Sequence, residues 1–183
     1  MTIAELGALG EFLGLFVIMA TLIYLAVQTN QAKRIALAEA RRNIGNDFIS
    51  IWGILGRDER LTRLVRLAVN DWDALGKNEQ MLVHAFFVNL LAHLDAALNQ
   101  EETLPELKRD LTAWEDNVLG LLTSPGGAVW FENTSYLYNP LMVERLRKRL
   151  AAPESLPPSW NSTMAWWQVD EVDQRALSTG DHA

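Results

Sequence analysis

Three side chains that could take part in metal or acid–base chemistry lie close together in the sequence: His84, His93 and Asp95. They fall in an apolar stretch that we predict to be one helix, residues 78–100. At about 100° per residue, His84 and His93 lie on opposite sides of such a helix, and His93 and Asp95 lie on different faces. A metal site would therefore need ligands from other segments. Candidate ligands from other segments are Glu101, Glu102 and Asp110.

Other catalytic patterns are missing from the sequence. It holds no E-x-x-H pair of the kind that builds di-metal sites in helix bundles, no G-x-S-x-G nucleophile turn and no phosphate-binding glycine loop. The absence of cysteine excludes disulfides, a thiol nucleophile and cysteine-ligated metals. We expect no catalytic residue, no metal and no cofactor, so an enzyme or metal protein centred on the two histidines is the weakest hypothesis.

The apolar run at residues 8–27, ALGEFLGLFVIMATLIYLAV, is the element around which the sequence is organised. Twenty helical residues rise about 30 Å, which matches the hydrocarbon thickness of a bilayer. The only charge is Glu11, in the first turn, where its carboxyl can reach the headgroups. Tyr24 lies near the far end, where its polar tip suits the interface. We predict a transmembrane helix.

Three alternatives compete with this prediction. A cleavable signal peptide would have a basic start and a small-residue cleavage site, neither of which is present. A buried core helix of a globular protein has a similar composition, and an interfacial helix would carry a charged face that this run lacks. A membrane span accounts best for its length and uniform apolarity.

The flanks of the run predict its orientation. Basic residues follow it, whereas residues 1–7 carry no lysine or arginine. The positive-inside rule puts the short amino terminus, residues 1–7, on the extracytoplasmic side of the membrane and the chain after the span in the cytoplasm. The basic cluster also suits contact with anionic lipid headgroups. Its members are Lys33, Arg34, Arg41 and Arg42.

Small residues recur along one face of the predicted span. Gly10 and Gly14 form a G-x-x-x-G pair, and Gly7 lies one heptad before Gly14. Such a face lets helix backbones approach closely, so we predict a homo-oligomerisation face, although glycine also occurs in membrane helices without this role. In a higher oligomer, Glu11 would form an acidic ring at a pore mouth, which is the alternative hypothesis of a channel or transport component.

The remainder of the sequence predicts an all-α fold. The span continues as a helix to about residue 55, and residues 28–152 form a cytoplasmic helical domain. Asp58 has the position of an N-cap for a second helix, and Thr103 with Glu106 has the spacing of a capping box for a helix that ends near residue 122. The SPGG stretch at residues 124–127 is expected to break the chain. A last helix from Pro140 carries basic residues on its outer face: Arg145, Arg147, Lys148 and Arg149.

From residue 153 to residue 183 the sequence changes to a tail rich in proline and tryptophan. Tryptophans in a polar segment tend to bury against something, which here could be the same domain, a neighbouring copy, another protein or the membrane surface. We predict docking on the same domain or on a neighbouring copy, because the acidic tail would be repelled by an anionic membrane. The residues concerned are Trp160, Trp166 and Trp167.

Two motifs together carry a family resemblance. The junction ATLIYLAVQTNQAKR and the later SPGGAVWF turn occur in this order. With them, the chain resembles a widespread group of uncharacterised bacterial single-pass membrane proteins of about this size, over residues 6–150. The resemblance implies a helical domain anchored in the bacterial inner membrane. It implies no activity and no catalytic residue, and it leaves out the tryptophan tail.

Composition limits the range of partners. The net charge of −7 and the pI near 5.0 argue against nucleic acid. The lipid bilayer, a second copy of the chain and another protein remain. We therefore expect a non-enzymatic, membrane-anchored, self-associating scaffold or interaction protein.

Overall fold

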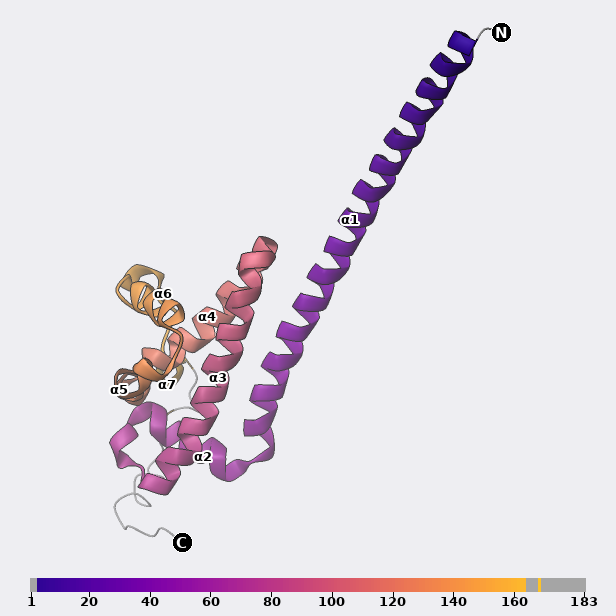
Figure 1. Ribbon diagram of the computed structural model, residues 1–183. Helices are drawn as coiled ribbons and strands as arrows, with labels where there is room; N and C mark the ends of the chain where they lie inside the picture. Colours follow the sequence, from indigo (N-terminus) through magenta and orange to yellow (C-terminus); the bar gives the residue numbers. More distant parts are fainter. Residues whose placement is uncertain (1–2, 164–167, 169–183) are drawn as a thin grey trace. The chain divides into compact units, whose positions relative to one another are not determined.

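The computed structural model describes residues 3–163 and residue 168, and every regular element within them is helical (Figure 1). The predicted all-α fold is confirmed: a long N-terminal helix, α1 (Ile3–Arg57), continues into a helical bundle. The chain divides into two compact units, Met1–Arg42 and Asn43–Ala183. This boundary lies inside α1, beyond the end of the predicted span.

The second unit begins with the end of α1 and the short amphipathic helix α2 (Glu59–Asn70). Asp58 is the N-cap of α2, as predicted, and its carboxylate accepts a hydrogen bond of 2.9 Å from the Leu61 amide. One face of α2 is buried against α3 and α5. The buried side chains are Leu64, Val65, Leu67, Ala68 and Val69.

Helix α3 (Lys77–Thr103) forms the centre of the bundle. It follows the short turn η1 (Trp72–Ala74), and it contacts both α2 and α4. Glu79 stabilises its start by accepting a hydrogen bond of 2.9 Å from the Gly76 amide. Apolar side chains on several faces are buried, as expected for a helix with neighbours around it: Val83, Phe86, Phe87, Leu90, Leu91, Leu94 and Ala97.

The predicted capping box at Thr103 and Glu106 is wrong. Helix α3 extends to Thr103, whose hydroxyl donates to the Gln100 carbonyl within α3. The next helix starts through a single 3₁₀ turn, η2 (Pro105–Leu107), and continues as α4 (Lys108–Leu122) without a side-chain cap. Proline at the first position of the turn replaces the cap, because its missing N–H needs no partner there.

The predicted break at residues 124–127 is right only at its start: α4 ends at Leu122 as predicted, but a new helix already begins at Pro125. Ser124 is the N-cap and Pro125 the first residue of α5 (Pro125–Thr134). A Cβ atom added at Gly126 would lie 1.7 Å from the Ala68 carbonyl oxygen of α2. Glycine is therefore required at the point where the backbones of α5 and α2 touch, and α5 buries Trp130 completely in the core.

The last elements lead from the bundle into the tail. The turn η3 (Ser135–Leu137) precedes α6 (Pro140–Leu150), which Asn139 caps through its side chain. Helix α6 packs on α4. The turn η4 (Pro153–Ser155) and the single-turn helix α7 (Trp160–Thr163) follow, and α7 contacts α2.

Candidate functional site

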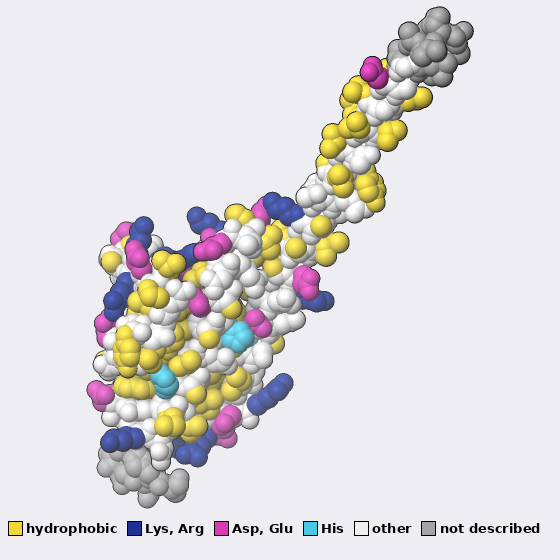
Figure 2. Space-filling view, in the orientation of Figure 1, with side chains coloured by type: hydrophobic (Ala, Val, Ile, Leu, Met, Phe, Trp, Pro, Cys, Tyr) yellow, Lys and Arg dark blue, Asp and Glu magenta, His cyan; other side chains and the backbone are white. Residues whose placement is uncertain are grey.

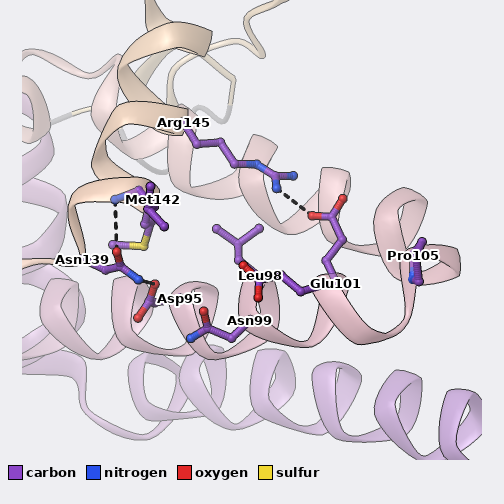
Figure 3. A pocket seen from close by; sticks show the side chains of 10 residues that line it. Asp95, Leu98, Asn99, Glu101, Pro105, Asn139, Met142 and Arg145 are labelled. Atoms are coloured by element: carbon purple, nitrogen blue, oxygen red, sulfur yellow. Dashed lines mark hydrogen bonds and ion pairs between the residues drawn. The ribbon is translucent and has the colours of Figure 1, made fainter.

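A polar groove lies between α3, η2 and α6, with a volume of about 410 Å³ (Figure 3). At one end, the Asn139 side-chain amide donates to the Asp95 carboxylate at 3.0 Å. At the other end, Arg145 Nη1 lies 2.6 Å from Glu101 Oε2. Leu98 and Met142 are apolar lining residues between them. The groove therefore combines fixed hydrogen-bonding groups with an apolar floor.

Arg145 also reaches a buried carboxylate behind the groove. The side chain of Glu115 on α4 is only 3% exposed, and it pairs with Arg145 and Arg149 of α6. Arg149 continues to Asp116 at 2.7 Å. The predicted outward basic face of α6 is thus wrong for two of its four members, because the buried carboxylate draws Arg145 and Arg149 toward α4.

The pKa of the Arg145 guanidinium is raised. Burial alone would lower it, but hydrogen bonds and charge interactions with Glu115 and Glu101 together outweigh that effect. The arginine therefore holds its charge permanently and acts as a fixed cross-link between three helices, α3, α4 and α6.

His84 lies in an adjacent hollow of about 330 Å³, next to Tyr138. Its Nδ1 accepts a hydrogen bond of 3.0 Å from the indole N–H of Trp130. This contact holds the imidazole against the core, since Trp130 in turn packs edge-on against Phe87. Burial raises the pKa of the Tyr138 hydroxyl from 10.0 to about 12, partly offset by the nearby Thr134 side chain.

His93 and Asp95 face other partners. His93 Nδ1 lies 3.3 Å from the Asp47 carboxylate of α1, whereas Asp95 contacts Asn139. His84, His93 and Asp95 therefore contact three different elements and do not converge. Within the described part of the chain, no group of three histidine, aspartate or glutamate side chains is placed to hold a metal ion.

The side chains that line the groove are suited to hydrogen bonding and charge pairing with a polar group. Its lining holds carboxylates, amides and one arginine, with no serine, lysine or histidine that could form a nucleophile–base pair. Asp95 and Arg145 are held by side-chain partners, so they could orient a bound polar group.

The first unit presents an apolar surface of a different kind. Between residues 12 and 27 the large apolar side chains of α1 are each 50% to 65% exposed (Figure 2). The few polar groups there are satisfied within the helix: the Thr21 hydroxyl donates to the Val17 carbonyl at 2.7 Å, and Gln28 donates to the Tyr24 hydroxyl at 2.6 Å. Glu11 is exposed at the start of this surface.

By length and composition, two helices in the described residues could cross a membrane, α1 and α3. Helix α3 is a core helix of the bundle, with much of its apolar surface buried. The window in α1 has none of its residues buried. In the described part of the chain, the long apolar stretch of α1 is thus exposed, whereas α3 buries apolar side chains in the bundle.

The residues predicted to mediate association and headgroup contact lie on exposed parts of α1. A Cβ atom added at Gly7, Gly10 or Gly14 would meet no atom within 4 Å. The basic cluster downstream is exposed as well: Lys33, Arg34, Arg41 and Arg42.

The predicted tail residues separate into two groups. Trp160 is 5% exposed, and its ring centroid lies 5.2 Å from that of Trp52, with the two rings tilted by 52°. Its indole N–H donates to the Asn117 carbonyl at 2.9 Å. Trp166 and Trp167 lie outside the described residues. The sequence did not predict that Asn117 and Gly120 of α4 would form the contact surface for Trp160. The one indication in the sequence was Gly120, a glycine inside a predicted helix.

Known proteins do not identify this site. No family model, curated protein or solved structure matches the chain. The resemblance to bacterial single-pass membrane proteins therefore stays a prediction, and function has to be inferred from the surfaces described above.

Proposed function

We propose that this protein is a non-enzymatic interaction or scaffold protein, anchored by α1 in the bacterial inner membrane, with its helical bundle in the cytoplasm. One observation carries the proposal: the apolar side chains between residues 12 and 27 are exposed, and among the described residues none in the apolar window of α1 is buried. In water, such a continuous surface is far larger than soluble proteins tolerate. A bilayer removes the unfavourable exposure of this apolar surface to water.

Polar detail supports the same environment. Hydrocarbon offers no hydrogen bonds, so polar groups within a span must be satisfied internally. The hydroxyl of Thr21 meets this requirement through the Val17 carbonyl. The exposed basic residues after the span favour the cytoplasmic side for the bundle.

Self-association through the glycine face is part of the proposal. Because Gly10 and Gly14 have open space around them in a single chain, larger side chains there would not disturb the chain itself. Leucine at both positions should therefore reduce oligomer mass in detergent or nanodiscs without unfolding the bundle. An unchanged oligomer mass for this double variant would show that Gly10 and Gly14 do not mediate self-association.

Cell fractionation with a matched pair of variants tests the anchor. Ile18 and Ile49 are 60% and 70% exposed, and only Ile18 lies in the proposed span. Ile18→Asp should move a large share of the protein from carbonate-washed membranes to the soluble or aggregated fraction, since a central charge opposes insertion by about 3 kcal/mol. Ile49→Asp should leave the distribution unchanged. Equal behaviour of the two variants would contradict the proposal.

A further inference from the structure

The groove between α3, η2 and α6 offers a ligand hydrogen-bond acceptors rather than donors. Its arginine is committed, because the Arg145 guanidinium is paired with Glu101 and with the buried Glu115. The side-chain amide of Asn139 donates to Asp95 Oδ1. Within the described part of the chain, no hydrogen bond reaches Asp95 Oδ2 or Glu101 Oε1, so each carboxylate keeps one oxygen for a donor from outside.

Asn139 fixes the carboxylate at one end of the groove. Its side-chain oxygen accepts from the Leu141 amide at 3.1 Å, and its side-chain nitrogen donates to Asp95 at 3.0 Å. Because both ends of the Asn139 amide are engaged, one oxygen of Asp95 is held in place. A ligand that meets the second oxygen therefore finds a carboxylate that is already oriented.

The groove also carries an excess of negative charge. The network behind it joins three carboxylates to two guanidinium groups, which leaves one negative charge. Asp95 and Glu102 line the groove without a cationic partner among the described residues, and they add two more negative charges. A cationic ligand is therefore favoured over an anion or a neutral molecule. The members of the network are Glu101, Glu115, Asp116, Arg145 and Arg149.

The spacing of the carboxylates suits an extended cation. Asp95 and Glu102 are seven positions apart in α3, so they lie on one face of the helix, about 10 Å apart along its axis. Leu98 lies between the two ends of the groove, and Met142, only 2% exposed, forms part of its floor (Figure 3). No three acidic or histidine side chains in the described residues are placed to hold one metal ion, so a compact cation does not match this arrangement.

The end of α3 adds to the preference for positive charge. Glu101 and Glu102 are in the last turn of this helix, which ends at Thr103. The C-terminal end of a helix carries a partial negative charge, which favours a cation nearby. No basic side chain of α3 lies in this last turn to compensate that charge.

We propose that this groove is a binding site for a linear aliphatic diamine whose two ammonium groups lie about 10 Å apart. One ammonium group pairs with Asp95, the other pairs with Glu101 and Glu102, and the methylene chain between them lies over Leu98 and Met142. The groove volume of about 410 Å³ falls in the range of small-molecule sites, about 300–1,000 Å³. Every lining residue belongs to the second unit, so diamine binding does not depend on the proposed membrane anchor.

Isothermal titration of the full-length protein, in nonionic detergent and low salt, tests the length of the ligand. The probes are diaminoheptane, diaminopropane and Mg²⁺, which carry the same charge at different separations. Diaminoheptane should bind once per chain and about fivefold or more tightly than the other two, because only its ammonium groups reach both ends of the groove. Absence of diaminoheptane binding, or equal affinity for the three dications, would overturn the proposal.

Matched variants test the location of the site. Asp95→Asn and Glu102→Gln each remove one charge from an end of the groove and should weaken diaminoheptane binding about fivefold or more. Glu132→Gln removes one charge from an exposed ion pair on α5, outside the groove, and should change the affinity by about twofold or less. Glu102 is exposed, so its replacement leaves the bundle folded even if Asp95→Asn loosens the contact with Asn139.

The variants also give the results that would contradict a groove site. Parent-like diaminoheptane affinity in Glu102→Gln would place binding elsewhere on the protein. Equal weakening in Glu102→Gln and Glu132→Gln would reduce the binding to a general attraction between a dication and an acidic protein. Either result would overturn the proposal.

Discussion

Glu115 is the residue that holds α6 against α4. Its buried carboxylate accepts from two arginines, Arg145 and Arg149, and Arg145 also bridges to Glu101 on α3. Taking a carboxylate out of water is costly unless it is paired in this way. This charge network therefore serves mainly to fix how α3, α4 and α6 meet. Loss of one charged member leaves the remaining charges partly buried without an opposite charge.

Replacing Glu115 with glutamine should lower the free energy of unfolding by about 2–4 kcal/mol, because two arginines lose their shared negative charge. Chemical denaturation of the detergent-solubilised protein measures this change. Glu132→Gln is the matched control: its pair with Arg147 is exposed, with a distance of 3.4 Å, so the change should be about 0.5 kcal/mol or less. Equal effects at both positions would argue against a buried network.

Tyr138 gives the bundle a dependence on alkaline pH. Burial raises the pKa of its hydroxyl from 10.0 to about 12, so the folded state favours the neutral phenol more than the unfolded state does. The stabilisation is complete below pH 10 and is lost as the pH rises from 10 to 12. Unfolding free energies across this range should fall more steeply for the parent than for Tyr138→Phe. Parallel pH profiles for the two proteins would contradict the assignment.

At the scale of elements, the contact between α5 and α2 explains a motif that the sequence presents as a chain break. Pro125, Gly126 and Gly127 were expected to interrupt the chain, because proline and glycine together usually mark turns. In the structure they form the first turn of α5, with Ser124 as the cap. The two glycines bring backbone against backbone, which a sequence pattern cannot reveal until the neighbouring helix is known.

Gly126→Ala should therefore destabilise the bundle by about 3 kcal/mol or more, since the added methyl collides with the Ala68 carbonyl oxygen at 1.7 Å. Gly45→Ala is the matched substitution in open space within α1. There alanine should stabilise the helix by about 0.5–1 kcal/mol. In thermal unfolding, the melting temperature should fall for Gly126→Ala and rise for Gly45→Ala relative to the parent. Shifts of the same sign for both variants would contradict the described α5–α2 contact.

Sequence reasoning worked where a single helix decides the outcome. Apolar periodicity predicted α2 and α3, the spacing of His84 and His93 predicted their separation, and Asp58 predicted the cap of α2. It failed where two helices meet. The inward turn of Arg145 and Arg149 depends on a buried carboxylate on another helix, and the seat of Trp160 depends on Gly120.

For the whole molecule, the contrast between the two units is the central feature. The second unit buries its apolar residues in a core, as in a water-soluble bundle. The first unit leaves a comparable set of apolar side chains on its surface. The two units therefore differ in surface character, which is the basis for proposing a bilayer around residues 8–27 and water around the bundle.

Single-cysteine labelling tests this claim most directly, because the chain has no cysteine of its own. Ile18→Cys and Ile49→Cys replace side chains with exposures of 60% and 70%, so the chain alone gives both positions similar access to water. In native membranes, a water-soluble maleimide should label position 49 and leave position 18 unmodified until the membrane is dissolved in denaturant. Equal labelling rates at both positions in intact membranes would contradict a membrane-spanning α1.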